Sequence, residues 1–136
     1  MDLEALRAAA MGGDAMAQAA LAWRLMRGEG LAKDPEQAVW WMGRAAEQGD
    51  AEAQYQVGAW LCLLDRACEA VGWWDRAAAQ GHRLAQRSLG HAYLHGHGVE
   101  ACPATARRWY AEAAGQGCEA SRAAMSELSG HLPEPD

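Results

Sequence analysis

The sequence predicts an all-α protein built from repeated helical hairpins, and three features carry this prediction. Alanine, the strongest helix former, accounts for 32 of the 136 residues, while Phe, Ile and Asn are absent. Only five residues are β-branched, four Val and one Thr, so the chain lacks the residues that favour strands. A short phrase that starts with two Ala and ends in Gly recurs four times, and Gln precedes this Gly in the last three copies. We therefore expect about eight helices, no β-sheet and a right-handed αα-superhelix, or solenoid.

The recurring phrase sets the length of the repeat. Its copies end at Gly13, Gly49, Gly81 and Gly117, at spacings of 36, 32 and 36 residues. A second phrase, Ala-x-x-Trp, precedes the last three copies and ends at Trp41, Trp73 and Trp109. We predict one domain over residues 1–130, with units at about 14–49, 50–81 and 82–117 and a half-repeat at each end. Residues 131–136 are expected to form a frayed tail.

Local signals place each helix in turn. A first helix at about 2–11 runs to the Gly12-Gly13 turn, where glycine favours a helix end. The second helix, 14–27, begins at Asp14 as its N-cap and leads into the loop Gly28-Glu29-Gly30-Leu31. Pro35 favours the first turn of a third helix, 35–47, because a missing N–H costs nothing there.

The remaining helices follow the same logic. Asp50 predicts the N-cap of a helix at 50–63, which runs almost directly into the next helix at 66–79 because the Gly-x-Gly loop is missing there. A helix at 82–95 leads into the loop 96–99, and Pro103 opens another at 103–115. The last helix is expected at 118–128, after Gly117.

These phrases together resemble the Sel-one-like repeat, a relative of the tetratricopeptide repeat, over about residues 8–128. The match is fullest in the third unit, with Leu89-Gly90-His91-Ala92-Tyr93 and Gly96-His97-Gly98-Val99. The resemblance implies a non-enzymatic scaffold that binds protein partners. Some bacterial members are secreted, disulfide-linked and described as binding β-lactams, but here Ala113 stands opposite Cys118 where those members have a cysteine pair. We therefore expect a bacterial interaction protein without catalytic residues or a cofactor.

A solenoid of this kind binds partners on the concave face, which the helices after each Gly turn would line. Helical spacing separates a core stripe from a neighbouring stripe on this face. The second stripe supplies the candidate partner-binding residues, which are Trp23, Arg27, Tyr55, Leu63, Arg87, His91, His95 and Arg122. Its aromatic end and its Arg/His end suit a protein or peptide with an acidic side chain or a free C-terminal carboxylate.

Two other functions stay open as alternatives. The chain could act as an immunity-type inhibitor or regulatory partner of another enzyme, again through protein binding. Less favoured is a metal-binding protein in which His91, His95 and His97 hold Zn²⁺, with Cys102 nearby; we expect no metal because no carboxylate completes the set.

Cysteine and tryptophan positions add further expectations. Cys62 and Cys68 flank the shortened loop within possible disulfide reach, although free thiols are the default in a reducing compartment. Cys102 and Cys118 are too far apart to pair, at opposite ends of one helix. One ring of each adjacent pair, Trp40-Trp41, Trp73-Trp74 and Trp109-Tyr110, is expected in the core. An exposed Trp40 or Trp74 would indicate self-association, and Trp60 is expected off the core stripe.

Charge and hydropathy exclude other classes of partner. A formal net charge of −6 argues against nucleic-acid binding, which requires a basic surface. No stretch approaches the roughly 20 apolar residues of a membrane span. The start, Met1-Asp2-Leu3-Glu4, does not resemble a signal peptide. We expect a cytoplasmic protein, either a monomer or a weak dimer.

Overall fold

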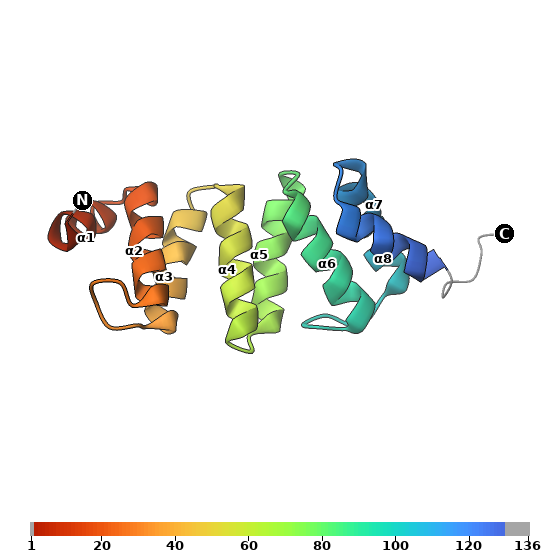
Figure 1. Ribbon diagram of the computed structural model, residues 1–136, viewed down its shortest axis with the longest axis horizontal. Helices are drawn as coiled ribbons and strands as arrows, with labels where there is room; N and C mark the ends of the chain where they lie inside the picture. Colours follow the sequence, from red (N-terminus) through yellow and green to blue (C-terminus); the bar gives the residue numbers. More distant parts are fainter. Residues whose placement is uncertain (1, 130–136) are drawn as a thin grey trace.

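The computed structural model describes residues 2–129, which form a row of helices laid side by side from the N-terminus to the C-terminus (Figure 1). They are α1 (Leu3–Met11), α2 (Ala15–Arg27), α3 (Pro35–Ala46), α4 (Ala51–Leu63), α5 (Ala67–Ala79), α6 (Arg83–His95), α7 (Pro103–Gly115) and α8 (Glu119–Ser129). No strand occurs in this range. Each helix packs mainly against the next in the chain, which makes a solenoid of αα-hairpins. The predicted fold class is confirmed, and the expected frayed tail at 131–136 lies outside the described residues.

The Gly turns and caps explain where the helices start and stop. The glycines that end the four phrases have φ angles of 99°, 105°, 88° and 90°, a region that side chains disfavour. Asp14 accepts hydrogen bonds from the backbone N–H groups of Met16 and Ala17 at 2.9 and 3.2 Å, as a predicted N-cap should. Asp50 caps α4 in the same way. In the third unit His82 takes this position, and its Nδ1 accepts from the Ala85 N–H at 3.1 Å.

The core is held at three equivalent places by a large side chain from one helix and a small residue opposite it. Met42, Trp74 and Tyr110 occupy the same position in α3, α5 and α7, and all three are buried. The equivalent positions of α2, α4 and α6 hold the small residues Ala22, Gly58 and Gly90. A Cβ atom added to Gly58 would lie under 3.0 Å from the Trp74 ring, and one added to Gly90 would lie 2.9 Å from the Tyr110 ring. An aromatic side chain therefore requires glycine at this contact.

A ladder of buried glutamines joins successive repeats. Gln18, Gln54 and Gln86 are almost fully buried, and each donates its Nε2 to a carbonyl at the end of the preceding helix, on Ala10, Ala46 and Ala78. Their Oε1 atoms accept from Gln48, Gln80 and Gln116 at 3.1, 2.9 and 2.7 Å. The Gln of each of the last three phrases thus reaches back to the previous repeat and satisfies a buried polar group.

The shortened loop of the second unit makes room for the loop of the third. Residues 64–66 alone connect α4 to α5, as the sequence predicts. The loop at Gly98 packs against the start of α5, where a Cβ atom would come under 3.0 Å from the backbone of Ala67 and Cys68. Since Gly98 also has a φ angle of 79°, both the space and the conformation require glycine.

Candidate partner-binding surfaces

The helices present two faces, which differ in their chemistry. We call the face formed by α2, α4, α6 and α8 the A face, and the face formed by α1, α3, α5 and α7 the B face. The candidate residues predicted from the sequence all come from the A-face helices or their ends. The structure brings some of them into one hollow and engages others in contacts within the chain.

Trp23 and Arg27, at the N-terminal end, are engaged within the chain. The Trp23 ring packs edge-to-face against Trp60, with 4.8 Å between the centroids, and the Arg27 guanidinium lies 4.6 Å from the Trp23 centroid. Arg27 also approaches Glu29 at 3.7 Å. The expectation that Trp60 lies off the core was wrong, because its side chain is only 4% exposed. Trp60 is buried because Trp23 from the preceding A-face helix covers it.

Tyr55 and Leu63 lie on α4 in different environments. The half-buried Tyr55 ring stacks on His82, with 4.9 Å between the centroids and 22° between the planes. His82 Nε2 in turn lies 2.6 Å from a carboxylate oxygen of Glu52. Leu63, the last residue of α4, is 78% exposed and stands as a free apolar side chain at the edge of the A face.

Arg87 and His91 line a hollow between α6 and α8, above two buried rings. Its lining residues are Trp74, Arg87, Ser88, His91, Tyr110, Ala120 and Ala124. The Arg87 side chain is half-buried and takes part in none of the ion pairs found within residues 2–129. Alanines on α8 leave this hollow open opposite the guanidinium. The hollow therefore contains the Arg87 guanidinium, which has no carboxylate partner among residues 2–129, and the aromatic rings of Trp74 and Tyr110.

Titratable groups beside Arg87 respond to its charge. Burial lowers the pKa of His91 below its usual value, and the neighbouring His95, His97 and Arg87 lower it further. Burial raises the pKa of the Cys118 thiol, but hydrogen bonds with Ser121 and the charges of Arg87 and Arg83 outweigh it, so the pKa is lowered overall. Arg87 and Arg83 thus place positive charge beside the hollow, while burial and, from the other direction, the charge of Glu127 raise the pKa of the Tyr110 hydroxyl.

Three imidazoles gather next to the hollow. The ring centroids of His91, His95 and His97 are 4.4 to 5.7 Å apart. Among the described residues, no group of three His, Cys, Asp or Glu side chains is arranged to hold a metal ion. Cys102 instead lies at the start of α7, where its Sγ is 3.2 Å from the Thr105 hydroxyl.

Arg122, the last of the candidate partner-binding residues, holds a different position in the repeat from Arg87. It is exposed on α8 and corresponds to the buried Gln86 of α6, 36 residues earlier, rather than to Arg87. Ala123 corresponds to Arg87. The hollow is accordingly lined on α8 by Ala120 and Ala124, and Arg122 is not among its lining residues.

The cysteines and paired aromatic residues complete the predicted features. All four cysteines are free thiols, including Cys62 and Cys68 beside the short loop. Trp74 and Tyr110 are the buried members of their pairs, as expected. The expectation was wrong for the first pair, in which Trp41 is only partly buried and Trp40 is 55% exposed, because Met42 takes the core position next to them.

The sequence reasoning missed three features of the A face: the N-cap role of His82, the buried glutamines and the core position of Trp60. A signal for the first two was present, since His82 and the Asp caps share one register and the glutamines recur four residues later at positions 18, 54 and 86. Trp60 has no such signal, because Arg24 and Ala92 occupy its position in the flanking repeats.

Comparisons with known proteins identify the repeat. A family model described as the Sel1 repeat matches residues 15–50, 51–67, 69–82 and 83–118. Among curated proteins none matches the sequence. No helix in the described part of the chain combines the length and apolar character needed to cross a membrane.

Two solved structures are similar over most of the chain. One is a protective antigen of uropathogenic Escherichia coli strains, described as displaying an SLR fold, with 40% identity and a TM-score of 0.81. The similarity covers 93% of this chain but 28% of that protein. The other is a Sel1 repeat protein from Oxalobacter formigenes, with 34% identity, a TM-score of 0.74 and coverage of 93% and 98% of the two chains.

Proposed function

This chain belongs to the Sel1 repeat family, and from that premise we propose that it captures a partner protein through the A-face hollow around Arg87 and His91. Proteins of this family generally mediate protein–protein interactions, and the fold is typically a non-enzymatic scaffold. The A face is also the one that the repeat pattern predicts to be concave. The partner we propose presents an acidic side chain or a free C-terminal carboxylate to Arg87.

The observation that carries this proposal is the environment of Arg87. A half-buried guanidinium without a carboxylate partner among residues 2–129 retains donors for a ligand. The guanidinium fork matches a carboxylate in a bidentate geometry, which favours an anion over a neutral group. Trp74 and Tyr110 form an apolar floor beneath the hollow, so a partner side chain would be removed from water as it binds.

Other predicted residues have secondary roles in this proposal. His91 and His95 would add positive charge when protonated, while the exposed Leu63 offers an apolar contact one repeat away. Trp23, Arg27 and Tyr55 already pack within the chain, so they would act as a preformed edge of the surface rather than as free anchors. Arg122 would lie at the rim, outside the hollow.

An affinity-capture experiment tests the proposal. The full chain and its Arg87→Glu variant would be used as baits in a lysate of the source cell, followed by titration of the captured protein. Arg107→Glu serves as the matched control, because Arg107 is exposed on the B-face helix α7 and carries the same charge change. We expect at least a tenfold loss of affinity for Arg87→Glu, since a bound carboxylate would then face another carboxylate.

Two outcomes would contradict the proposal. Equal loss in Arg87→Glu and Arg107→Glu would indicate a non-specific effect of net charge, and unchanged capture by Arg87→Glu would exclude the hollow. Adding Arg122→Glu then asks whether binding extends to the rim of α8. A captured enzyme whose activity falls on binding would support the immunity-type or regulatory function, which uses the same surface.

A further inference from the structure

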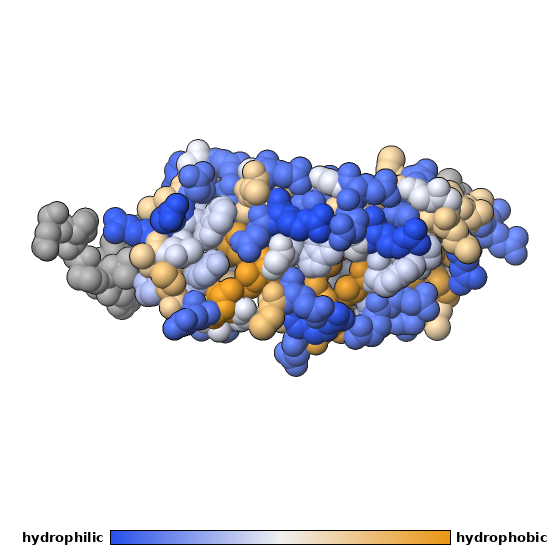
Figure 2. All heavy atoms as spheres, turned by 180° about the vertical axis from the view of Figure 1, so that it is seen from behind, coloured by the Kyte–Doolittle hydropathy of each residue, from blue (hydrophilic) through white to orange (hydrophobic). Residues whose placement is uncertain are grey.

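The B face carries hollows of its own, which neither the family nor the proposed function accounts for. Two of these hollows, between α1 and α3 and between α3 and α5, are lined by residues at equivalent positions of the repeat, and a third lies beside Trp109 among α5, α6 and α7. One wall of each is the repeated tryptophan, Trp41, Trp73 or Trp109. Hydrophobic surface lies at the bottom of the hollows on the side of the molecule seen from behind, between hydrophilic ridges (Figure 2).

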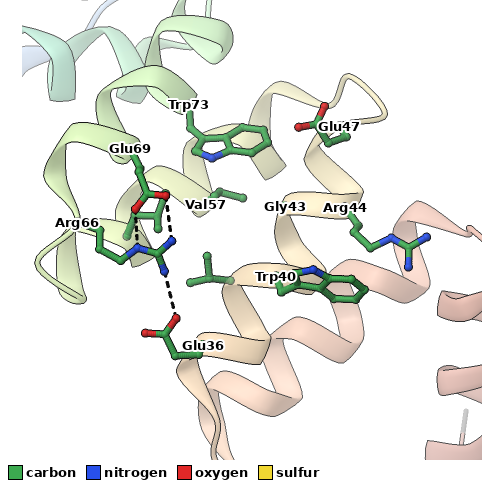
Figure 3. A pocket seen from close by; sticks show the side chains of 11 residues that line it. Glu36, Trp40, Gly43, Arg44, Glu47, Val57, Arg66, Glu69 and Trp73 are labelled. Atoms are coloured by element: carbon green, nitrogen blue, oxygen red, sulfur yellow. Dashed lines mark hydrogen bonds and ion pairs between the residues drawn. The ribbon is translucent and has the colours of Figure 1, made fainter.

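The middle hollow departs from its neighbours at two positions of α3. Gly43 stands where α1 has Arg7 and α5 has Asp75. Trp40 stands where α1 has Glu4 and α5 has Gly72. Without a side chain at position 43, space remains in front of Trp73, whose ring lies 3.9 Å from where a Cβ atom would be. The result is a slot with an indole on either side of Gly43, shown in Figure 3.

The bottom of this slot is aliphatic and its rim is charged. Val39, Val57 and Leu61, all buried core residues, form the bottom. The rim holds three carboxylates, of Glu36, Glu47 and Glu69, against two guanidinium groups, of Arg44 and Arg66. A third guanidinium group, of Arg76, pairs with Glu47 from just outside the lining, so three carboxylates face three guanidinium groups and the slot is close to neutral.

The arginines at the slot are already engaged, while the carboxylates keep spare acceptor capacity. Arg66 donates to Glu69 at 2.5 and 2.9 Å and to Glu36 at 3.1 Å. Arg76 donates to both oxygens of Glu47 at 3.2 and 3.3 Å. Each carboxylate oxygen accepts more than one hydrogen bond, so the exposed carboxylates remain open to a further donor.

The indoles of the slot already receive guanidinium groups from the chain itself. The Arg44 guanidinium carbon lies 5.1 Å from the Trp40 centroid, and that of Arg76 lies 4.6 Å from the Trp73 centroid. Both distances fall in the range of cation–π attraction. Indole faces, an aliphatic bottom for an alkyl stem and a rim rich in acceptors together match one side chain, because arginine combines a planar cation with an apolar stem.

We propose that the slot between Trp40 and Trp73 is a docking site for an arginine side chain of a partner protein. Its alkyl stem would lie over Val57 and Leu61, its guanidinium would lie against the indoles, and its N–H groups would donate to the carboxylates of Glu36 or Glu69. The two faces of the solenoid then select opposite charges, an anion on the A face and a cation on the B face.

NMR titration of the full chain tests this site with defined probes. The probe is the peptide acetyl-Gly-Ser-Arg-Ser-Gly-amide, followed through the indole N–H resonances of Trp40 and Trp73. Two matched peptides replace Arg by citrulline, its neutral isostere, or by norleucine, which keeps only the apolar stem. We expect the arginine peptide to shift both indole signals and to bind about tenfold more tightly than the citrulline peptide, with the difference reduced at high salt.

Two helix-interior glycines supply variants with a matched control. Gly43→Leu should fill the slot and weaken binding of the arginine peptide at least tenfold, whereas Gly72→Leu, on α5 where an added Cβ meets nothing within 4 Å, should leave it unchanged. Trp40→Ala should weaken binding about fivefold. A far-UV circular dichroism spectrum of each variant separates loss of the site from loss of the fold.

Three results would overturn the proposal. Equal binding of the citrulline or norleucine peptide would mean that the slot takes an apolar group, not a cation. Unchanged affinity in Gly43→Leu would place the arginine elsewhere. Sedimentation velocity that shows a dimer of the unliganded chain, lost in Trp40→Ala, would assign the slot to a second copy of this protein. The A-face variant Arg87→Glu should bind the peptide normally, so failure of one site is distinguishable from failure of the other.

Discussion

The contact between Gly58 and Trp74 gives a quantitative test of how the repeats are packed. Gly58 lies inside α4, and the Trp74 ring from α5 rests directly on it, with the indole N–H donating to the Tyr55 carbonyl at 3.3 Å. The perturbation is Gly58→Ala, a change that normally stabilises a helix. Here the added methyl group would overlap a buried indole, so we expect the opposite sign.

Three contributions set the magnitude. Overpacking a buried site costs about 1–3 kcal/mol, and the upper end applies because an indole cannot bend away. Displacing the ring also weakens the hydrogen bond from Trp74 to Tyr55, worth about 1 kcal/mol. Replacing Gly by Ala inside a helix returns about 1 kcal/mol. The net expectation is a destabilisation of about 2–3 kcal/mol, whereas Gly72→Ala, in open space on α5, should be stabilising by up to ~1 kcal/mol.

The first repeat shows which second change should compensate. There Ala22 and Met42 hold the positions of Gly58 and Trp74, so Gly58→Ala combined with Trp74→Met copies a pair of residues that this chain already contains. Urea unfolding followed by circular dichroism would measure the wild type, both single variants and the double variant. We expect the double variant to be more stable than the sum of the single losses by about 1–2 kcal/mol. Additivity within about 0.5 kcal/mol, or a neutral Gly58→Ala, would refute the reasoning.

Other predictions concern the ladder, the loop and the histidines. Gln80→Ala leaves a buried acceptor without its donor and should cost about 1–3 kcal/mol in urea unfolding, whereas Gln56→Ala, on the half-buried edge of α4, should cost less than ~1 kcal/mol. Gly98→Ala should destabilise by at least ~1 kcal/mol more than Gly30→Ala, since both have positive φ but only Gly98 packs against the start of α5. By NMR titration His91 should protonate below pH 6.5. Because its pKa is lower in the folded state, its contribution to stability should fall as pH drops below 6.5.

Much of the fold could be predicted because each helix boundary carries a local signal. Asp14, Asp50, Pro35 and Pro103 mark helix starts through backbone hydrogen bonding, and the structure places all of these starts within one residue of the prediction. The glycines of the Gly turns mark helix ends through their positive φ angles. These effects act within a few residues, so they can be read without knowing what packs against the helix.

The candidate surfaces were harder to predict because they depend on which residue of the next helix lies opposite. Arg122 was assigned to the A-face stripe by helical spacing within α8, but alignment from Cys118 puts it in register with Gln86. Trp60 was expected outside the core because it lies off the stripe that Val57 and Leu61 form on the same helix. Only the contact with Trp23, from a different repeat, buries its ring. Such contacts between repeats leave no periodic signal in the sequence.

The B-face slot was also not predicted from the repeat, because it depends on two residues, Trp40 and Gly43, that differ from their counterparts in the other repeats. The neighbouring hollow between α1 and α3 has Arg7 at the position of Gly43 and Glu4 at the position of Trp40. Its rim differs too, with Met11 in place of Glu47 and Gln37 in place of Glu69. Grafting Arg7→Gly and Glu4→Trp there would copy the two indoles without the carboxylates.

This double variant separates the contribution of the indole rings to arginine binding from that of the carboxylates. If the indoles provide the larger part of the affinity, the double variant should bind two arginine peptides per chain, measured by isothermal titration calorimetry, and the new site should show little dependence on salt. If the carboxylates are required, the stoichiometry should stay at one. The native slot should lose affinity with salt in either case, since Glu36 and Glu69 are exposed and their attraction for a cation is screened. A salt-independent native slot would mean that its carboxylates, already paired with Arg66, contribute nothing to binding, and that stacking alone holds the arginine.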